Sequence, residues 1–229
     1  MQIVNGIAAV LLGYLLGSIP FGLLIVKIKT GKDVREVESG RTGGTNVVRA
    51  AGFWAGLLTA ALDILKGAVS VWIAQSLSPD NHLMSILAPI GAILGHNYSV
   101  FLIKLDENRK LRFHGGAGGA PALGGAMGLW LPMLPIVVIA GALVWFTLGI
   151  ASVTTLAIGL SVIVVFALRA LLGVHEPIEI WYGVMAELLL ILALRPNIKR
   201  LMAGNERVVK FSLNGWLRTK KEAKTTFRK

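Results

Sequence analysis

Long apolar stretches separated by short polar segments dominate the chain, and this pattern predicts membrane-spanning helices. The first stretch, Ile3 to Val26, is roughly 24 residues long, whereas the apolar core of a cleaved signal peptide has about 7 to 15. It should therefore stay as a helix. Two further stretches of spanning length, Phe53 to Leu77 and Leu83 to Ile103, are separated by turn-forming residues at 78–81 and should form a tight hairpin.

The middle of the chain is apolar but has less obvious boundaries. The region from Gly119 to Gly173 is almost uncharged and has room for two ordinary spans or three short ones of about 17 to 20 residues. The basic residues after the last span favour a cytoplasmic C-terminus, and this requires three crossings in the region rather than two. Breaks between the crossings are therefore expected near 130–135 and 147–152. A last span should run from Ile178 to Leu194. We therefore predict an all-α integral membrane protein with about seven transmembrane helices.

Basic residues between and after the apolar stretches predict the orientation. The chain carries 23 Lys and Arg against 12 Asp and Glu, a net charge of +11, while 55% of its residues are hydrophobic. Basic segments follow the first, third and last spans, so these segments should face the cytoplasm, with the N-terminus outside and the C-terminus inside. The expected organisation is a polytopic membrane unit over 1–209 and a basic cytoplasmic tail over 210–229. Nucleic acid is excluded as a partner, because spans too apolar for water interrupt the basic residues.

The segment after the first span, SGRTGGTNVVR at 39–49, has the composition of an anion-binding loop. Its glycines at 40, 43 and 44 allow positive φ and let backbone N–H groups converge on phosphate oxygens. Arg49 can pair with a phosphate through two parallel hydrogen bonds. A flexible polar loop is the alternative, but a guanidinium and an amide at fixed spacing beside the bilayer favour a functional site.

Two further polar clusters follow later spans. GHNYSVFL begins at Gly95 and contains His96, which could orient a substrate hydroxyl, act as a general base or simply pack in the core. The glycine run at 115–119 is similar to a phosphate-wrapping turn that leads into a helix N-terminus. RPNIKRLMAGNE begins at Arg195, and an amphipathic surface helix would also explain its basic residues.

Taken together, SGRTGGTNVVRAAG, ALDILKG, GHNYSVFL, the glycine run and RPNIKRLMAGNE resemble the motif series of the bacterial acyl-phosphate-dependent glycerol-3-phosphate acyltransferases, the PlsY family. The resemblance extends to about Val209. It implies a multi-pass enzyme of the bacterial inner membrane that moves an acyl group from acyl phosphate to glycerol-3-phosphate. The products would be lysophosphatidic acid, for phospholipid biosynthesis, and inorganic phosphate. It also implies no metal, no cofactor, no covalent acyl-enzyme and a functional link to an enzyme that produces acyl phosphate.

The resemblance also implies roles for individual residues. Ser39, Asn46 and Arg49 would bind phosphate, His96 would line the site, and Asn197 would close it. Of these, His96, Arg49 and Ser39 are the expected catalytic residues. The other expected substrate-binding residues are small or hydroxyl-bearing ones: Gly40, Gly43, Thr45, Gly115, Gly116, Gly118 and Ser152.

The chain departs from the family pattern at two positions. The family has a lysine within GGKG where this chain has Ala117, and a histidine three residues before Asn197 where this chain has Leu194. Losing a phosphate-pairing ammonium costs about 2 to 5 kcal/mol in a partly buried site. Candidates to replace the missing charge are Lys110, Arg112 and His114.

These departures leave two alternatives to an active acyltransferase. One is a catalytically impaired relative that binds phosphorylated lipid precursors without turnover. The other is a small anion transporter, suggested by glycine-broken helices and by intramembrane charges such as Asp63 and Lys66, which are three residues apart on one helix face. The transporter ranks last, because no inverted repeat is visible.

Overall fold

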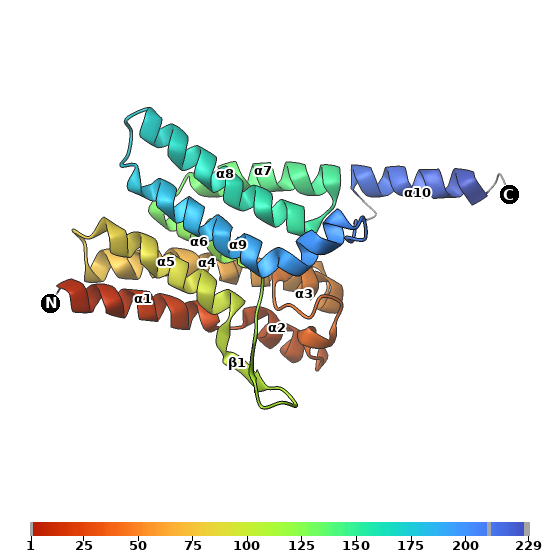
Figure 1. Ribbon diagram of the computed structural model, residues 1–229, viewed down its shortest axis with the longest axis horizontal. Coiled ribbons are helices and arrows are strands. Elements are labelled where there is room, and N and C mark those ends of the chain that lie inside the picture. Colours follow the sequence, from red (N-terminus) through yellow and green to blue (C-terminus); the bar gives the residue numbers. More distant parts are fainter. Residues whose placement is uncertain (1, 210–211, 227–229) are drawn as a thin grey trace.

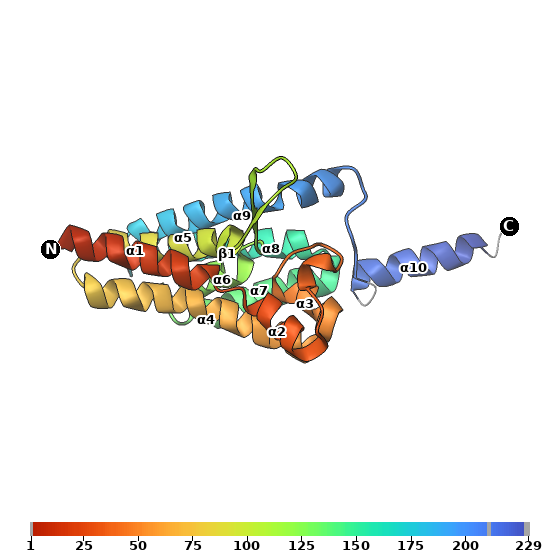
Figure 2. The ribbon, with the colours of Figure 1, turned by 90° about the horizontal axis from the view of Figure 1, so that it is seen from below.

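Helices that run side by side along one long axis make up most of the structure, a computed structural model that describes residues 2–209 and 212–226 (Figure 1). One end of the bundle carries α2, α3 and the C-terminal part of α9, and we call it the motif end; α10 extends beyond it (Figure 2). In chain order the elements are α1 (Gln2–Ser18), α2 (Phe21–Thr30), the 3-10 helix η1 (Val34–Glu36), α3 (Gly44–Ala51), α4 (Phe53–Leu77), α5 (His82–Asn97), β1 (Ser99–Leu105), β2 (Leu111–His114), α6 (Gly119–Leu129), α7 (Met133–Leu148), α8 (Ala151–Leu171), α9 (Ile178–Met202) and α10 (Leu213–Thr226).

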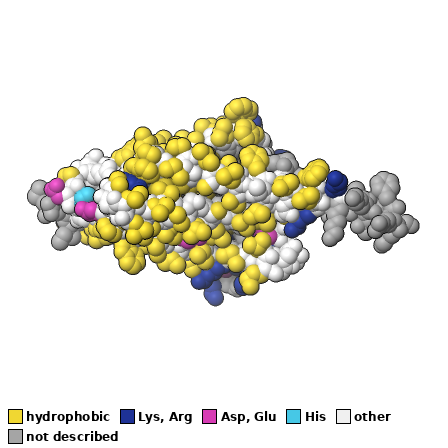
Figure 3. Space-filling model, turned by 90° about the horizontal axis from the view of Figure 1, so that it is seen from above, with side chains coloured by type: hydrophobic (Ala, Val, Ile, Leu, Met, Phe, Trp, Pro, Cys, Tyr) yellow, Lys and Arg dark blue, Asp and Glu magenta, His cyan; other side chains and the backbone are white. Residues whose placement is uncertain are grey.

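The outer surface of the bundle is apolar, as an integral membrane protein requires. Hydrophobic side chains cover most of the face seen in Figure 3. Segments long and apolar enough to cross a bilayer are Val4–Thr30, Phe53–Leu77, His82–Leu102 and Ala151–Leu171; the first is broken between α1 and α2, and the third ends in β1. Met133–Leu148 is a shorter apolar helix. The predicted all-α integral membrane fold is confirmed, whereas the count of seven spans and the sidedness stay predictions.

The first apolar run is two helices rather than one. α1 ends at Ser18, and α2 begins at Phe21, directly after Pro20. Proline has no N–H to donate, and its ring clashes with the preceding helical turn, so the helix breaks at this point. The expectation of a single helix over Ile3–Val26 was therefore wrong.

The third apolar run is only partly helical. α5 ends at Asn97, and the chain continues as β1, which pairs antiparallel with β2. The turn between the strands is fixed by Asp106, whose Oδ1 accepts from the Lys110 N–H at 2.8 Å. Valine, phenylalanine and isoleucine in β1 favour a strand as much as a membrane helix. The expected helix over Leu83–Ile103 is wrong beyond Asn97.

The middle region breaks where expected, between α6 and α7 at Trp130–Pro132 and between α7 and α8 at Gly149–Ile150. The expected length of the first piece is wrong: α6 has 11 residues, about 16 Å, against a hydrocarbon core of about 30 Å. α6 is almost wholly buried inside the bundle, where Tyr182 of α9 donates to the carbonyl of Ala122 at 2.6 Å. A short helix is tolerated at membrane depth because protein surrounds its ends.

The last apolar helix is longer than expected. α9 begins at Ile178, as predicted, but runs to Met202 rather than ending near Leu194. Pro196 lies inside it and removes one N–H from the helical ladder. The third motif cluster therefore lies largely on the C-terminal end of α9. In the residues described beyond it, α10 folds from the basic tail, and Asn214 donates to the carbonyl of Leu148 at the end of α7 at 3.1 Å.

Close backbone packing joins α1 to α5. Gly13 and Gly17 on α1, and Gly91 and Gly95 on α5, are each four residues apart, and a Cβ at any of them would contact backbone of the other helix. Small residues at this spacing let membrane helices approach closely and gain van der Waals contact. Because α5 carries His96 and Asn97 at its end, this contact helps to place the site.

Gly17→Val should lower the thermal unfolding midpoint of the purified protein in detergent. The added side chain would push against the backbone of Ala92, and such overpacking costs about 1 to 3 kcal/mol. Leu11→Val is the matched control, because it places the same residue on an exposed face of α1. Equal midpoints for the two variants would contradict the packing argument.

Candidate active site

The three polar clusters of the sequence meet at one groove near the motif end. The groove has a volume of about 400 Å³, and its wall combines the loop after α2, the end of α5, β2 with the glycine run, and α9. Its lining residues are Gly40, Arg41, Asn97, Tyr98, Phe113, His114, Gly115, Gly116, Leu192, Ala193, Arg195 and Pro196. The expected convergence of the three clusters is therefore present in the fold.

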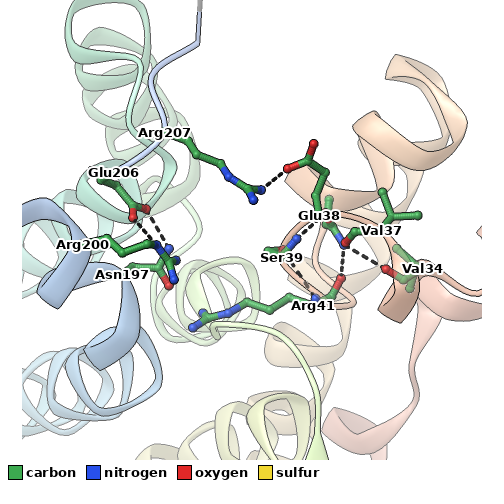
Figure 4. Close-up of polar contacts among 10 residues, drawn as sticks. Val34, Val37, Glu38, Ser39, Arg41, Asn197, Arg200, Glu206 and Arg207 are labelled. Atoms are coloured by element: carbon green, nitrogen blue, oxygen red, sulfur yellow. Dashed lines mark hydrogen bonds and ion pairs between the residues drawn. The ribbon is translucent and has the colours of Figure 1, made fainter. Parts of the chain in front are cut away.

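Asn46 organises the first motif loop. Its Nδ2 donates to the carbonyls of Val34 at 3.0 Å, Val37 at 2.9 Å and Arg41 at 2.9 Å, and its Oδ1 accepts from the Ser39 N–H at 3.5 Å. Figure 4 labels these four partners along the loop. The side chain is buried. These contacts make Asn46 a support for the loop backbone, and its expected contact with phosphate stays a prediction.

The glycines of the motifs differ in their roles. Positive φ occurs as expected at Gly40, +67°, and it also occurs at Gly118, +88°, directly before α6. The expectation was wrong at Gly43, which has φ −76°, and at Gly44, which begins α3. A Cβ on Gly44 would lie 2.9 Å from the carbonyl oxygen of Gly56, so this glycine permits close packing of α3 on α4.

Arg41 reaches the groove, whereas Arg49 and Thr45 do not line it. Arg49 and Thr45 are exposed on α3. Arg41 lies in the wall and donates through Nη2 to the carbonyl of Ala193 on α9 at 2.6 Å. Burial, followed by the charge of Arg200, lowers the pKa of Arg41, but a guanidinium stays protonated at any physiological pH. Arg41 and Arg49 both belong to the first motif, and their spacing alone does not show which of them lines the groove.

The glycine run is fitted against the end of α5 and the first motif loop. The Gly116 N–H donates to the carbonyl of His96 at 2.9 Å, and the Thr42 N–H donates to the carbonyl of Gly115 at 3.3 Å. A Cβ on Gly116 would collide with the His96 ring at Nε2. Glycine is therefore required at this position by the backbone approach.

His96 lies behind the glycine run rather than in the groove wall. Its Nδ1 is 2.9 Å from Lys66 Nζ, which in turn pairs with Asp63 Oδ1 at 2.8 Å. The predicted placement of Asp63 and Lys66 on one helix face is confirmed, and there the two form an ion pair. A general-base role for His96 stays a prediction, while its contacts give it a positioning role toward Gly116.

Glu206 joins the residues expected from the third motif. Its Oε1 accepts from Asn197 Nδ2 at 2.7 Å, and its Oε2 accepts from Arg200 Nε at 2.9 Å (Figure 4). Oε1 also accepts from Ser152 Oγ at 3.1 Å. Burial alone would raise the pKa of Glu206, but these three hydrogen bonds outweigh it and lower the pKa. Sequence reasoning missed Glu206, although it lies within the RPNIKRLMAGNE segment.

An ion pair also ties the last motif to the first. Arg207, next to Glu206, pairs with Glu38, next to Ser39 (Figure 4). Ser39 itself accepts through Oγ from the Arg41 N–H at 3.4 Å, so it shapes the turn that carries Arg41. The two loops therefore approach each other across the motif end.

The two departures from the family pattern lie in different surroundings. Leu194 is 3% exposed and packs in the interior, whereas Ala117 is half-buried and directly follows Gly116 of the groove wall. Of the three candidates for replacing a lysine at 117, only His114 lines the groove. Arg112 lies on the hairpin, where it pairs with Asp106 at 3.3 Å, and Lys110 is exposed beside it.

The fold and the groove define an integral membrane protein with a basic, glycine-walled site between apolar helices. A family model described as glycerol-3-phosphate acyltransferase matches residues 7–204. Glycerol-3-phosphate acyltransferases of Rhodopseudomonas palustris (strain HaA2) and Myxococcus xanthus (strain DK1622) are 39% and 38% identical. Each alignment covers 87% of this chain, and 93% and 97% of the respective relatives.

The solved structures that match this chain are of the same family as these relatives. The crystal structure of PlsY, an integral membrane glycerol 3-phosphate acyltransferase, in its glycerol 3-phosphate form matches with a TM-score of 0.75 at 31% identity. The match covers 89% of this chain and 95% of that one. Its lysophosphatidic acid form matches with a TM-score of 0.74 at 29% identity, over 90% and 96% of the two chains. The chain belongs to the glycerol-3-phosphate acyltransferase family, and it is an acyltransferase rather than an anion transporter.

Glu206→Gln should destabilise the protein at neutral pH but not in acid. Because the pKa of Glu206 is lowered in the folded state, its carboxylate stabilises the fold above the ordinary value of 4.5, and this stabilisation is lost as the pH falls through the lowered pKa. Each kcal/mol lost moves the midpoint by about 2 to 4 °C. Thermal unfolding of both proteins between pH 7 and pH 3 should show a gap that closes in acid; a constant gap would contradict this.

Proposed function

We propose that this chain transfers an acyl group from an acyl phosphate to glycerol-3-phosphate, giving lysophosphatidic acid and inorganic phosphate. The proposal rests on one observation: the segments that carry all three family motifs form the wall of a single basic groove. Acyl phosphate as the donor, and the bacterial inner membrane as the location, are parts of this proposal. The membrane unit over 1–209 would perform the chemistry, and the basic tail over 210–229 would face the cytoplasm.

The reaction needs little covalent help from the protein. A hydroxyl oxygen of glycerol-3-phosphate attacks the acyl carbonyl carbon, an ester bond forms, and the bond from that carbon to the phosphate oxygen breaks. The electron pair leaves with inorganic phosphate, and the hydroxyl proton passes to a phosphate oxygen or to solvent. The protein must hold two phosphate groups close together and stabilise the developing oxyanion, which are tasks for guanidinium, amide and backbone N–H groups.

The groove supplies groups of these kinds from several elements. Arg41 and Arg195 place guanidinium groups at its wall, and the glycine run leads into the N-terminus of α6. A helix N-terminus carries partial positive charge and unpaired N–H groups. The apolar outer surface of the surrounding helices would let the acyl chain stay in lipid while the headgroup enters the groove.

The remaining expected residues support this wall in the proposed site. Ser39, Gly40, Gly43 and Asn46 shape the first loop, and Gly115, Gly116 and Gly118 shape the second. Asn197 and Ser152 are held together through Glu206. Arg49 and Thr45 lie on α3, from which Arg49 would bind a phosphate approaching the edge of the groove.

Purified full-length protein in detergent should release inorganic phosphate from an acyl phosphate when glycerol-3-phosphate is present, with one lysophosphatidic acid formed per phosphate. Arg49→Ala should lower the rate by at least about 30-fold if its guanidinium pairs with phosphate in the transition state. Phosphate release and mass spectrometry of the lipid product measure the two sides of the reaction.

Arg112→Ala is the control, because it removes an arginine from the exposed hairpin and should keep the rate of the parent protein. The proposal fails if the parent protein makes no lysophosphatidic acid. The choice of donor fails if an acyl thioester serves equally well in place of the acyl phosphate.

A further inference from the structure

Two polar side chains at the groove have hydrogen-bonding capacity that the described part of the protein does not use. Nη1 of Arg41 is buried and has no hydrogen-bond partner there. Asn97 is 5% exposed, and neither its Oδ1 nor its Nδ2 has a partner. Both residues line the groove. Buried polar atoms are nearly always paired, so these atoms point to a ligand.

The framework around both side chains is fixed. Nη2 of Arg41 is held by the carbonyl of Ala193, while Nη1 of this groove-lining residue has no partner in the described part of the protein. Asn97 is the last residue of α5, and its amide lies against Gly118, whose hypothetical Cβ would be 2.8 Å from Oδ1. A cation and an amide donor thus flank the glycine run from two sides.

The charge of these groups indicates the class of ligand. Arg41 cannot lose its proton, and an unpaired buried cation is costly unless an anion joins it. Glu206 is the acidic group that acts most strongly on Arg41, but its carboxylate is already occupied by Asn197, Arg200 and Ser152. A planar guanidinium with a free edge, an amide and backbone N–H groups together match the oxygens of a phosphate.

We propose that Arg41 and Asn97 form the phosphate-binding subsite of this chain and replace the charge that is missing at Ala117. Arg41 would donate through Nη1, and Asn97 would donate through Nδ2, to the phosphate of one substrate. The inference rests on the proposed function for its substrate class, a phosphate monoester or an acyl phosphate. It adds a residue from the first motif loop to the groove wall and explains how the glycine run works without a lysine.

The geometry also distinguishes Arg41 from the other basic residues considered for this role. Lys110 and Arg112 lie on the exposed hairpin outside the groove wall. His114 lines the groove, and its Nδ1 is buried without a partner in the described structure, but an imidazole, unlike a guanidinium, is not a permanent cation. Among these four residues, Arg41 is the one that combines a permanent charge, a side chain held at the groove and a donor without a partner in the described structure.

The first test measures binding without turnover. Isothermal titration of the full-length protein in detergent with inorganic phosphate should show binding that is weakened at least about tenfold in Arg41→Gln and in Asn97→Asp, which keeps the shape of the side chain and adds a repelling charge. Arg35→Gln is the matched control: it makes the same change in the same loop, where Arg35 is bound to Asp33 at 2.6 Å. Unchanged phosphate binding in both Arg41→Gln and Asn97→Asp would overturn the inference.

The second test identifies the substrate and guards against misfolding. Arg41→Gln should raise the KM for either glycerol-3-phosphate or acyl phosphate, and the substrate affected is the one whose phosphate the subsite binds. Adding Ala117→Lys to Arg41→Gln should raise kcat/KM above that of Arg41→Gln alone, because a lysine after Gly116 can return a charge to the groove. Rescue would exclude a purely structural role for Arg41, and its absence in a folded double variant would contradict replacement of the charge.

The two tests separate this inference from the proposed function. A parent protein that binds phosphate through Arg41 but makes no lysophosphatidic acid would support the subsite and refute the activity. An active parent protein, together with an Arg41→Gln variant that equals it in phosphate binding and in both KM values, would support the activity and refute the subsite.

Discussion

Inside a bilayer, a backbone N–H or C=O without a partner costs several kcal/mol, and no water is present to supply one. This constraint sets where the protein can be irregular. Beside the groove, the chain leaves the helical form in two adjoining places, the end of α5 at Asn97 and the glycine run before α6. There the Gly116 N–H finds the carbonyl of His96, and the Thr42 N–H finds that of Gly115. The groove exists because two helices stop early inside a bundle whose other members continue past them.

The site is consequently built in two layers. Residues behind the groove fix backbone: Asn46 binds three carbonyls of the first loop, His96 packs against Gly116, and Glu206 gathers donors from α8 and α9. Residues in the wall, such as Arg41 and Asn97, keep donors that nothing in the described protein occupies. A motif can therefore be diagnostic of the family although many of its residues never touch substrate, because the position of a phosphate to a fraction of an ångström depends on the supporting layer.

The sequence predicted the parts of this fold that hydropathy determines, namely the apolar helices, the two breaks in the middle region and the start of α9. The sequence-based prediction failed where an apolar segment can form either a helix or a strand. The run after Asn97 is as suitable for a strand as for a helix, and only pairing with β2 decides between them. The short α6 could not be foreseen, because the length of an apolar region says nothing about which piece is enclosed by neighbours. For the site, spacing found the right segments but could not show that Arg41, and not Arg49, lines the groove, because side-chain direction depends on the loop fold that Asn46 supports. The phosphate-binding role of Arg49 stays a prediction.

A phosphate site requires a cation close to the phosphate, and residues at different positions in the sequence can supply it. Two unit charges about 4 Å apart interact by roughly 4 kcal/mol at an effective dielectric constant near 20, whichever backbone position carries the cation. An arginine on the facing loop can therefore supply the charge that a lysine on the glycine run would supply, provided that a hydrogen bond fixes the arginine side chain. Arg41 meets that condition through the carbonyl of Ala193. It also keeps its proton when the site is closed off from water, a setting in which a lysine ammonium readily loses its own.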